Sequence, residues 1–223
     1  MSDLRLVVFD VDGTLVDSQG EIVAAMTEAF AAQDVPLPPR ETLLSIVGLS
    51  LPVAMARLAP EVDETTLAHL VETYRTAFAE NRRRGALPPL YPGALDVLDR
   101  LAAEDDTLLG IATGKSRRGL AAILEAHGLA NRFLTRQVAD DHPSKPHPAM
   151  LRAALAETGV EADRAVMVGD TTYDIEMAGA AGMASVAVSW GYHAPKALGG
   201  ADRVIGDFAA LPAVLNELLE QQR

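Results

Sequence analysis

Short apolar runs alternate along this chain with stretches of helical periodicity, and this alternation restricts the possible folds more than any other feature. The apolar runs cover residues 4–9, 107–112, 165–168, 184–188 and 203–205. The helical stretches cover residues 94–103, 117–126, 148–157, 174–181 and 208–219. Strands that alternate with helices build a parallel sheet with both faces covered. We therefore predict an α/β fold with a Rossmann-like, doubly wound parallel sheet, whose ligand lies beyond the carboxyl ends of the strands.

A long insert interrupts the alternation directly after the first apolar run. Residues 16–89 have helical periodicity, for instance at Ile22 and Met26, and contain no convincing strand. Connections within α/β units usually have only a few residues, so an insert of this length is expected to form a unit of its own. We predict a core domain of residues 1–15 and 90–223, and a small all-helical cap domain of residues 16–89 hinged over the strand ends.

Charge and composition exclude several classes of protein. The chain has 223 residues, 31 acidic and 19 basic side chains, a formal net charge of −12 and no cysteine. This negative field repels a phosphate backbone, so we expect no nucleic-acid partner. Without cysteine, neither disulfides nor thiolate metal sites can form. No leader-like segment and no run of about 18 apolar residues occurs, so we expect a cytoplasmic location and no membrane partner.

Polar groups suited to phosphate chemistry follow three of the predicted strands. Asp10-Val11-Asp12-Gly13-Thr14 follows the first, Thr113-Gly114-Lys115 the second, and Gly169-Asp170 with Asp174 the third. Lys145, one of three lysines in the chain, lies in a proline-flanked loop. Each motif alone is also compatible with ordinary turn or helix-cap chemistry. Together they predict that the acids near the start of the chain, the downstream acids and Lys145 converge at one edge of the sheet.

In this order, the four segments resemble the motifs of the haloacid dehalogenase (HAD) phosphatase superfamily, most closely its phosphoglycolate-phosphatase-like branch. The resemblance covers the core, and the insert matches the position, length and helicity of a cap. One departure is Thr113-Gly114-Lys115, where many phosphoglycolate phosphatases carry Thr-Asn-Lys. The resemblance implies a phosphatase for a small phosphomonoester such as phosphoglycolate. It would be a monomer or a homodimer that binds a small phosphorylated metabolite.

The chemistry of this reaction assigns roles to the acids of the motifs. A phosphomonoester dianion repels an anionic nucleophile unless cations neutralise the combined charge. Asp10 and Asp170 are the expected Mg²⁺ ligands, and the resemblance adds the backbone carbonyl of Asp12. Asp10 is the expected nucleophile, which forms an aspartyl-phosphate. The Asp12 side chain is expected to protonate the leaving group and later to accept a proton from water.

The remaining motif residues are expected to bind the phosphoryl group. Lys145 and the Thr113 hydroxyl are predicted to stabilise its oxygens, assisted by the backbone N–H of Gly114. Gly13 and Thr14 of the first motif are counted among the phosphate-binding residues. By analogy with the family, Asp174 orients Lys145 or a water molecule on the metal.

Several alternative functions remain open at this point. A phosphosugar mutase or a pyrophosphatase would use the same four groups and differ in the cap. A signalling receiver module also takes a phosphoryl group on an Asp beside Mg²⁺, but its domain is about half this length and has no place for the insert. A binding protein without catalysis is the last alternative, although every catalytic group is present.

Overall fold

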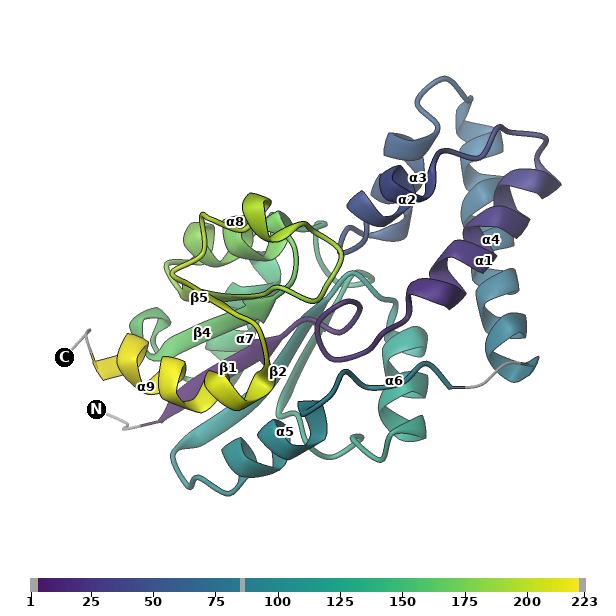
Figure 1. Ribbon diagram of the computed structural model, residues 1–223. Coiled ribbons are helices and arrows are strands. Elements are labelled where there is room, and N and C mark those ends of the chain that lie inside the picture. The colour runs from purple at the N-terminus through teal and green to yellow at the C-terminus, as the bar shows by residue number, and fades with distance from the viewer. Residues whose placement is uncertain (1–3, 85–86, 221–223) are drawn as a thin grey trace.

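The computed structural model describes residues 4–84 and 87–220 (Figure 1). Residues 1–3 and 221–223 of the predicted core, and residues 85–86 of the predicted cap, lie outside the described residues. The strands are β1 (Arg5–Phe9), β2 (Thr107–Thr113), β3 (Thr135–Val138), β4 (Ala165–Gly169), β5 (Ala184–Val188) and β6 (Arg203–Ile205). The helices are α1 (Gln19–Ala32), α2 (Arg40–Ser45), α3 (Leu51–Leu58), α4 (Glu64–Arg84), α5 (Ala94–Ala102), α6 (Arg117–Ala126), α7 (Ala149–Thr158), α8 (Thr172–Ala181) and α9 (Leu211–Glu220), with 3₁₀ turns at Ala162–Arg164, Pro195–Ala197 and Phe208–Ala210.

The six strands form one parallel sheet in the order β3-β2-β1-β4-β5-β6. The chain moves outward from β1 to β3, then returns across the sheet to β4 on the other side of β1. The direction of winding therefore changes between β1 and β4, and this is the switch point where doubly wound sheets bind ligands. The predicted Rossmann-like α/β fold is confirmed.

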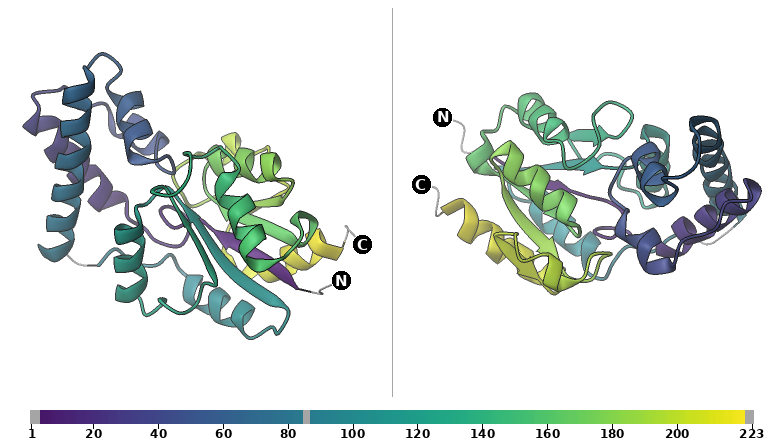
Figure 2. Two further views of the ribbon diagram at one scale, coloured as in Figure 1. Left: turned by 180° about the vertical axis from the view of Figure 1, so that it is seen from behind. Right: turned by 90° about the horizontal axis from the view of Figure 1, so that it is seen from above.

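Helices cover both faces of the sheet because successive side chains of a strand point to opposite faces. Val7 and Phe9 of β1 pack in one buried cluster with residues of α5, α6 and α9. Leu6 and Val8 pack in a second cluster with residues of α7 and α8. The sheet is therefore the middle of three layers, as Figure 2 shows from behind and from above.

Helices α1–α4 form a separate apolar cluster of their own. Ile22, Met26 and Phe30 of α1 pack with Met55 of α3 and Leu70 of α4 in this cluster. In every view, these helices lie at the opposite end of the sheet from both chain termini (Figures 1 and 2). They therefore stand beside the carboxyl end of β1, from which the chain enters α1.

The two connections between α1–α4 and the sheet lie side by side. The Asp17 N–H donates to the Pro89 carbonyl at 2.9 Å, and the Tyr91 N–H donates to the Leu15 carbonyl at 2.9 Å. Val16 and Leu90 form an antiparallel bridge between them. A two-stranded connection therefore carries the chain into and out of the helical insert.

The sequence analysis missed one strand, β3 at the edge of the sheet. Its sequence, Thr-Arg-Gln-Val, is short and has one apolar residue, so it lacks the apolar run that marks the interior strands. An edge strand has a neighbour on one side only, and β3 pairs with β2 alone. In the part of the chain that the structure describes, no helix is both long and apolar enough to cross a membrane.

Candidate active site

The loop after β1 places Asp10 against the end of β4. The Asp10 N–H donates to the Val168 carbonyl at 2.9 Å, which extends the pairing of the two strands by one residue. Gly13 turns the loop with φ +82°, and a Cβ atom there would lie 2.3 Å from Oδ2 of Asp170. Only glycine allows both this backbone conformation and this close approach. The loop therefore wraps around the carboxylate that follows β4.

Three buried carboxylates meet at this switch point. Oxygens of Asp10, Asp170 and Asp174 all lie within 4.8 Å of one another. Nζ of Lys145 lies 2.9 Å from Oδ2 of Asp10 and 2.7 Å from Oδ1 of Asp174. All four side chains are almost completely buried. The structure thus brings together the upstream acid, the downstream acids and the lysine, as the motifs predicted.

Each remaining oxygen of the downstream acids has a defined partner. Asp170 accepts hydrogen bonds from the Thr14 hydroxyl at 2.9 Å and from the Tyr192 N–H at 2.8 Å. Asp174 accepts from the Thr171 hydroxyl at 2.7 Å and from its N–H at 3.1 Å, at the start of α8. Thr14 is one of the predicted phosphate-binding residues, and in this structure its hydroxyl orients Asp170. Asp174 holds Lys145, in agreement with an orienting role.

The electrostatics of this cluster favour a bound cation. Burial raises the pKa of Asp10 to about 7, with Lys145 opposing the rise and Asp174 adding to it. Burial, Asp174 and Asp10 also raise the pKa of Asp170 well above its usual range. Burial alone would lower the pKa of Lys145, but Asp10 and Asp174 raise it, so this side chain stays charged. If Asp10 and Asp170 both ionise, their negative charges share the ammonium of Lys145 with Asp174, so a cation bound between them would stabilise the ionised carboxylates.

One atom identifies where such a cation fits. Among the described residues, Oδ2 of Asp10 accepts no hydrogen bond although it is buried, and its one polar contact is the ion pair with Lys145. Buried carboxylate oxygens normally have such partners or ligate a metal. Asp10 and Asp170, with Asp174 beside them, could therefore hold a divalent cation that prefers oxygen ligands.

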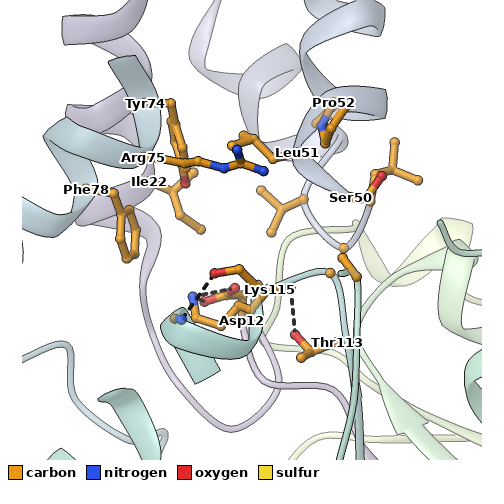
Figure 3. A pocket seen from close by; sticks show the side chains of 18 of the residues that line it. Asp12, Ile22, Ser50, Leu51, Pro52, Tyr74, Arg75, Phe78, Thr113 and Lys115 are labelled. Atoms are coloured by element: carbon orange, nitrogen blue, oxygen red, sulfur yellow. Dashed lines mark hydrogen bonds and ion pairs between the residues drawn. The ribbon is translucent and has the colours of Figure 1, made fainter. Parts of the chain in front are cut away.

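Asp12 lies apart from this cluster and faces a different set of groups. Nζ of Lys115 donates to both of its carboxylate oxygens, at 2.7 and 2.8 Å (Figure 3). The same Nζ lies 5.0 Å from the ring centroid of Phe78 on α4. The Ser18 hydroxyl also donates to Asp12. The sequence analysis assigned no role to Lys115. Its place directly after Thr113-Gly114 in the second motif was the available signal.

Thr113 and Gly114 lie where β2 ends. Thr113 is buried, and its hydroxyl oxygen accepts a hydrogen bond from the Lys115 N–H at 3.3 Å. A Cβ atom on residue 114 would lie 2.5 Å from the Leu49 carbonyl oxygen and 2.6 Å from that of Gly48. The loop between α2 and α3 therefore rests on the bare backbone of Gly114, and any other residue would push it away.

A cavity of about 510 Å³ opens above these groups, between the strand ends and helices α1, α3 and α4 (Figure 3). Asp10, Asp12, Thr113, Gly114 and Lys115 belong to its lining. Lys145, Asp170 and Asp174 lie beneath this floor and are buried. Charged side chains therefore lie at and below the floor of a cavity that the helical insert helps to enclose.

Comparisons with known proteins agree with this arrangement. The family model described as "Haloacid dehalogenase-like hydrolase" matches residues 7–188. A probable phosphatase IndB of Dickeya dadantii is 36% identical over 96% of this chain and 95% of its own. A phosphoglycolate phosphatase of Rhodospirillum rubrum is 36% identical over 93% of this chain and 89% of its own. The crystal structure of a hydrolase from Pseudomonas syringae superposes with a TM-score of 0.84 at 27% identity, covering 96% of this chain and 98% of that one.

Proposed function

This chain belongs to the haloacid dehalogenase-like hydrolases, and we propose that it is a Mg²⁺-dependent phosphatase that hydrolyses a small phosphomonoester through an aspartyl-phosphate. One observation carries the proposal: Asp10, Asp170, Asp174 and Lys145 converge beside a cavity at the switch point of the sheet. The names of its relatives support phosphatase activity, and two-carbon 2-phosphoglycolate is the candidate substrate that they suggest. A cytoplasmic location stays a prediction.

The side chains have complementary roles in the proposed reaction. A carboxylate oxygen of Asp10 attacks phosphorus, and the bond from phosphorus to the leaving oxygen breaks as Asp12 donates a proton to that oxygen. Water then attacks the aspartyl-phosphate, Asp12 accepts the proton, and the Asp10 carboxylate is restored with release of phosphate. Asp10, Asp170 and the Asp12 carbonyl would hold the proposed Mg²⁺, which would supply positive charge against the repulsion that otherwise opposes attack.

Lys145, Thr113 and the Gly114 N–H are the proposed ligands of the phosphoryl oxygens, and Asp174 orients Lys145. We further propose that residues 16–89 act as a cap on the core of residues 1–15 and 90–223. The paired connection at Val16 and Leu90 is its hinge. Closure of such a cap excludes bulk water from the reacting groups.

Hydrolysis of p-nitrophenyl phosphate tests the proposed function. We expect turnover with Mg²⁺, loss of turnover in EDTA, and recovery when Mg²⁺ is added back. Inorganic pyrophosphate and a sugar bisphosphate are assayed in parallel. Turnover that is unaffected by EDTA, or isomerisation of the sugar bisphosphate without net release of phosphate, would refute the proposal.

The raised pKa values of Asp10 and Asp170 predict how the stability of the metal-free protein depends on pH. Between pH 4 and 7, Asp10 keeps a proton in the folded protein that it loses in the unfolded chain, and the raised pKa of Asp170 acts in the same direction. Each therefore lowers the free energy of unfolding by up to about 1.4 kcal/mol per pH unit as the pH rises through this window. Thermal unfolding in EDTA from pH 5 to 8 measures the effect.

Mg²⁺ should reverse this loss, since a ligand at 100 times its Kd stabilises a folded protein by about 2.7 kcal/mol. The increase in Tm should be larger at pH 8 than at pH 5. Asp10→Asn is the matched variant, because removing one titrating carboxyl should flatten the pH dependence. A metal-free Tm that rises steadily with pH, or a pH dependence that Asp10→Asn does not change, would contradict the prediction.

A further inference from the structure

The cavity is much larger than a phosphoryl group and a two-carbon leaving group require. Its volume of about 510 Å³ lies within the range of about 300–1,000 Å³ that is typical of pockets for drug-sized ligands. The phosphoryl group takes only the floor, beside Asp10 and Thr113. Most of the space above the floor is therefore available to the leaving group of the substrate.

The wall around this space is mainly apolar. Figure 3 shows Ile22 of α1, Leu51 and Pro52 at the start of α3, and Tyr74 and Phe78 of α4 around the space above Asp12. Arg75 of α4 and Ser50 before α3 also belong to this wall (Figure 3), so polar groups interrupt the apolar surface above the polar floor. A small polar leaving group would leave this wall in contact with water, whereas an apolar leaving group would bury it.

The α4 side of the wall is an aromatic surface. The rings of Tyr74 and Phe78, one helical turn apart, stack with centroids 5.7 Å apart and an interplanar angle of 27°. Ala79 and Arg82 continue the same helix face along the cavity. The ring of Phe78 also contacts Nζ of Lys115, which lies on the floor of the cavity. The rings of Tyr74 and Phe78 therefore offer an aromatic surface against which a flat ring in the leaving group can pack.

From these observations we infer that the substrate is a phosphate ester of an alcohol that carries a ring, and that 2-phosphoglycolate is a poorer substrate. This inference rests on the proposed phosphatase function. The ring contributes binding energy by displacing water from Ile22, Leu51 and Tyr74. This binding energy favours closure of the insert over the site. Closure stabilises the transition state as well as the bound substrate.

A set of esters with chemically similar leaving oxygens tests the inference. 2-Phenylethyl phosphate, ethyl phosphate and 2-phosphoglycolate are all esters of primary alcohols, so they differ mainly in the group that enters the cavity. We expect kcat/KM for 2-phenylethyl phosphate to exceed that of each of the other two by at least about tenfold.

A pair of variants on α4 locates the origin of the preference. Ala79→Phe fills the cavity and should reduce the ratio of kcat/KM for 2-phenylethyl phosphate to that for ethyl phosphate by about tenfold or more. Ala68→Phe adds the same side chain at an exposed position of α4 outside the cavity lining, and should keep the wild-type ratio.

The possible failures are distinguishable. If all three esters are hydrolysed in a Mg²⁺-dependent way but 2-phosphoglycolate is best, or the ratio is the same in Ala79→Phe and wild type, the inferred substrate class is wrong and the phosphatase function stands. If none of these esters nor p-nitrophenyl phosphate is hydrolysed, the proposed function itself fails, and the inference fails with it.

Discussion

Asp10→Asn is expected to lower kcat by about 10⁴-fold or more while the protein stays folded. An amide cannot replace the attacking carboxylate, and loss of a covalent nucleophile is among the largest effects that one substitution has on an enzyme. Steady-state hydrolysis of p-nitrophenyl phosphate measures the loss. Intact mass after acid quenching should show a phosphoryl adduct on the wild-type chain and none on the variant.

Two measurements separate lost chemistry from lost structure in this variant. Asp10 is a buried carboxyl with a raised pKa, so a neutral side chain of nearly the same size should leave Tm in EDTA unchanged or higher at pH 8. Asp105→Asn makes the same change at an exposed position before β2 and should retain wild-type activity. A kcat for Asp10→Asn within tenfold of wild type would rule out Asp10 as the nucleophile.

Lys145→Met is expected to have the largest effect on stability. Its Nζ lies between Asp10 and Asp174, and removing one partner of a buried ion pair costs about 3–5 kcal/mol because the remaining charge is left uncompensated. Urea unfolding in EDTA at pH 8, where the carboxyls are most ionised, measures the cost. Activity should fall as well, by about 10²- to 10³-fold, which is typical for loss of one charge-stabilising donor.

The double variant Lys145→Met/Asp174→Asn tests whether charge is the cause of the instability. Removing the carboxylate that the lysine neutralised should recover part of the lost free energy of unfolding, so the two substitutions should be non-additive. Lys196→Met, at an exposed lysine in the turn Pro195–Ala197, is the matched control and should be neutral. Equal losses in the two lysine variants would contradict the prediction.

The sheet and the acidic centre could be predicted because their signals are local. Interior strands such as β1 and β4 are buried on both faces, so each is a continuous apolar run that stops at the residue with the functional side chain. Parallel strands then bring Asp10 and Asp170 to the same edge. The edge strand β3 escaped prediction because it lacks an apolar run: its buried residues Thr135 and Gln137 are polar and are accommodated by side-chain hydrogen bonds.

Contacts between distant loops could not be predicted. Lys115 and Asp12 are 103 residues apart, and their ion pair depends on how the loop after β2 lies against the loop after β1. The hydrogen bond from the Thr14 hydroxyl to Asp170 also joins residues 156 positions apart, and the role of Thr14 in phosphate binding stays a prediction. Periodicity likewise predicts that α4 has an apolar face without showing that part of this face lines a cavity.

The sequence by itself determined the class of fold, the site of the insert and the residue types available for phosphoryl transfer, since each depends on neighbours in the chain. Only the tertiary structure decided the charge balance of the buried acids, the partners of Asp12 and the shape of the cavity above them. Those properties arise from distances between segments far apart in the chain, and electrostatic and packing energies depend on such distances rather than on residue order.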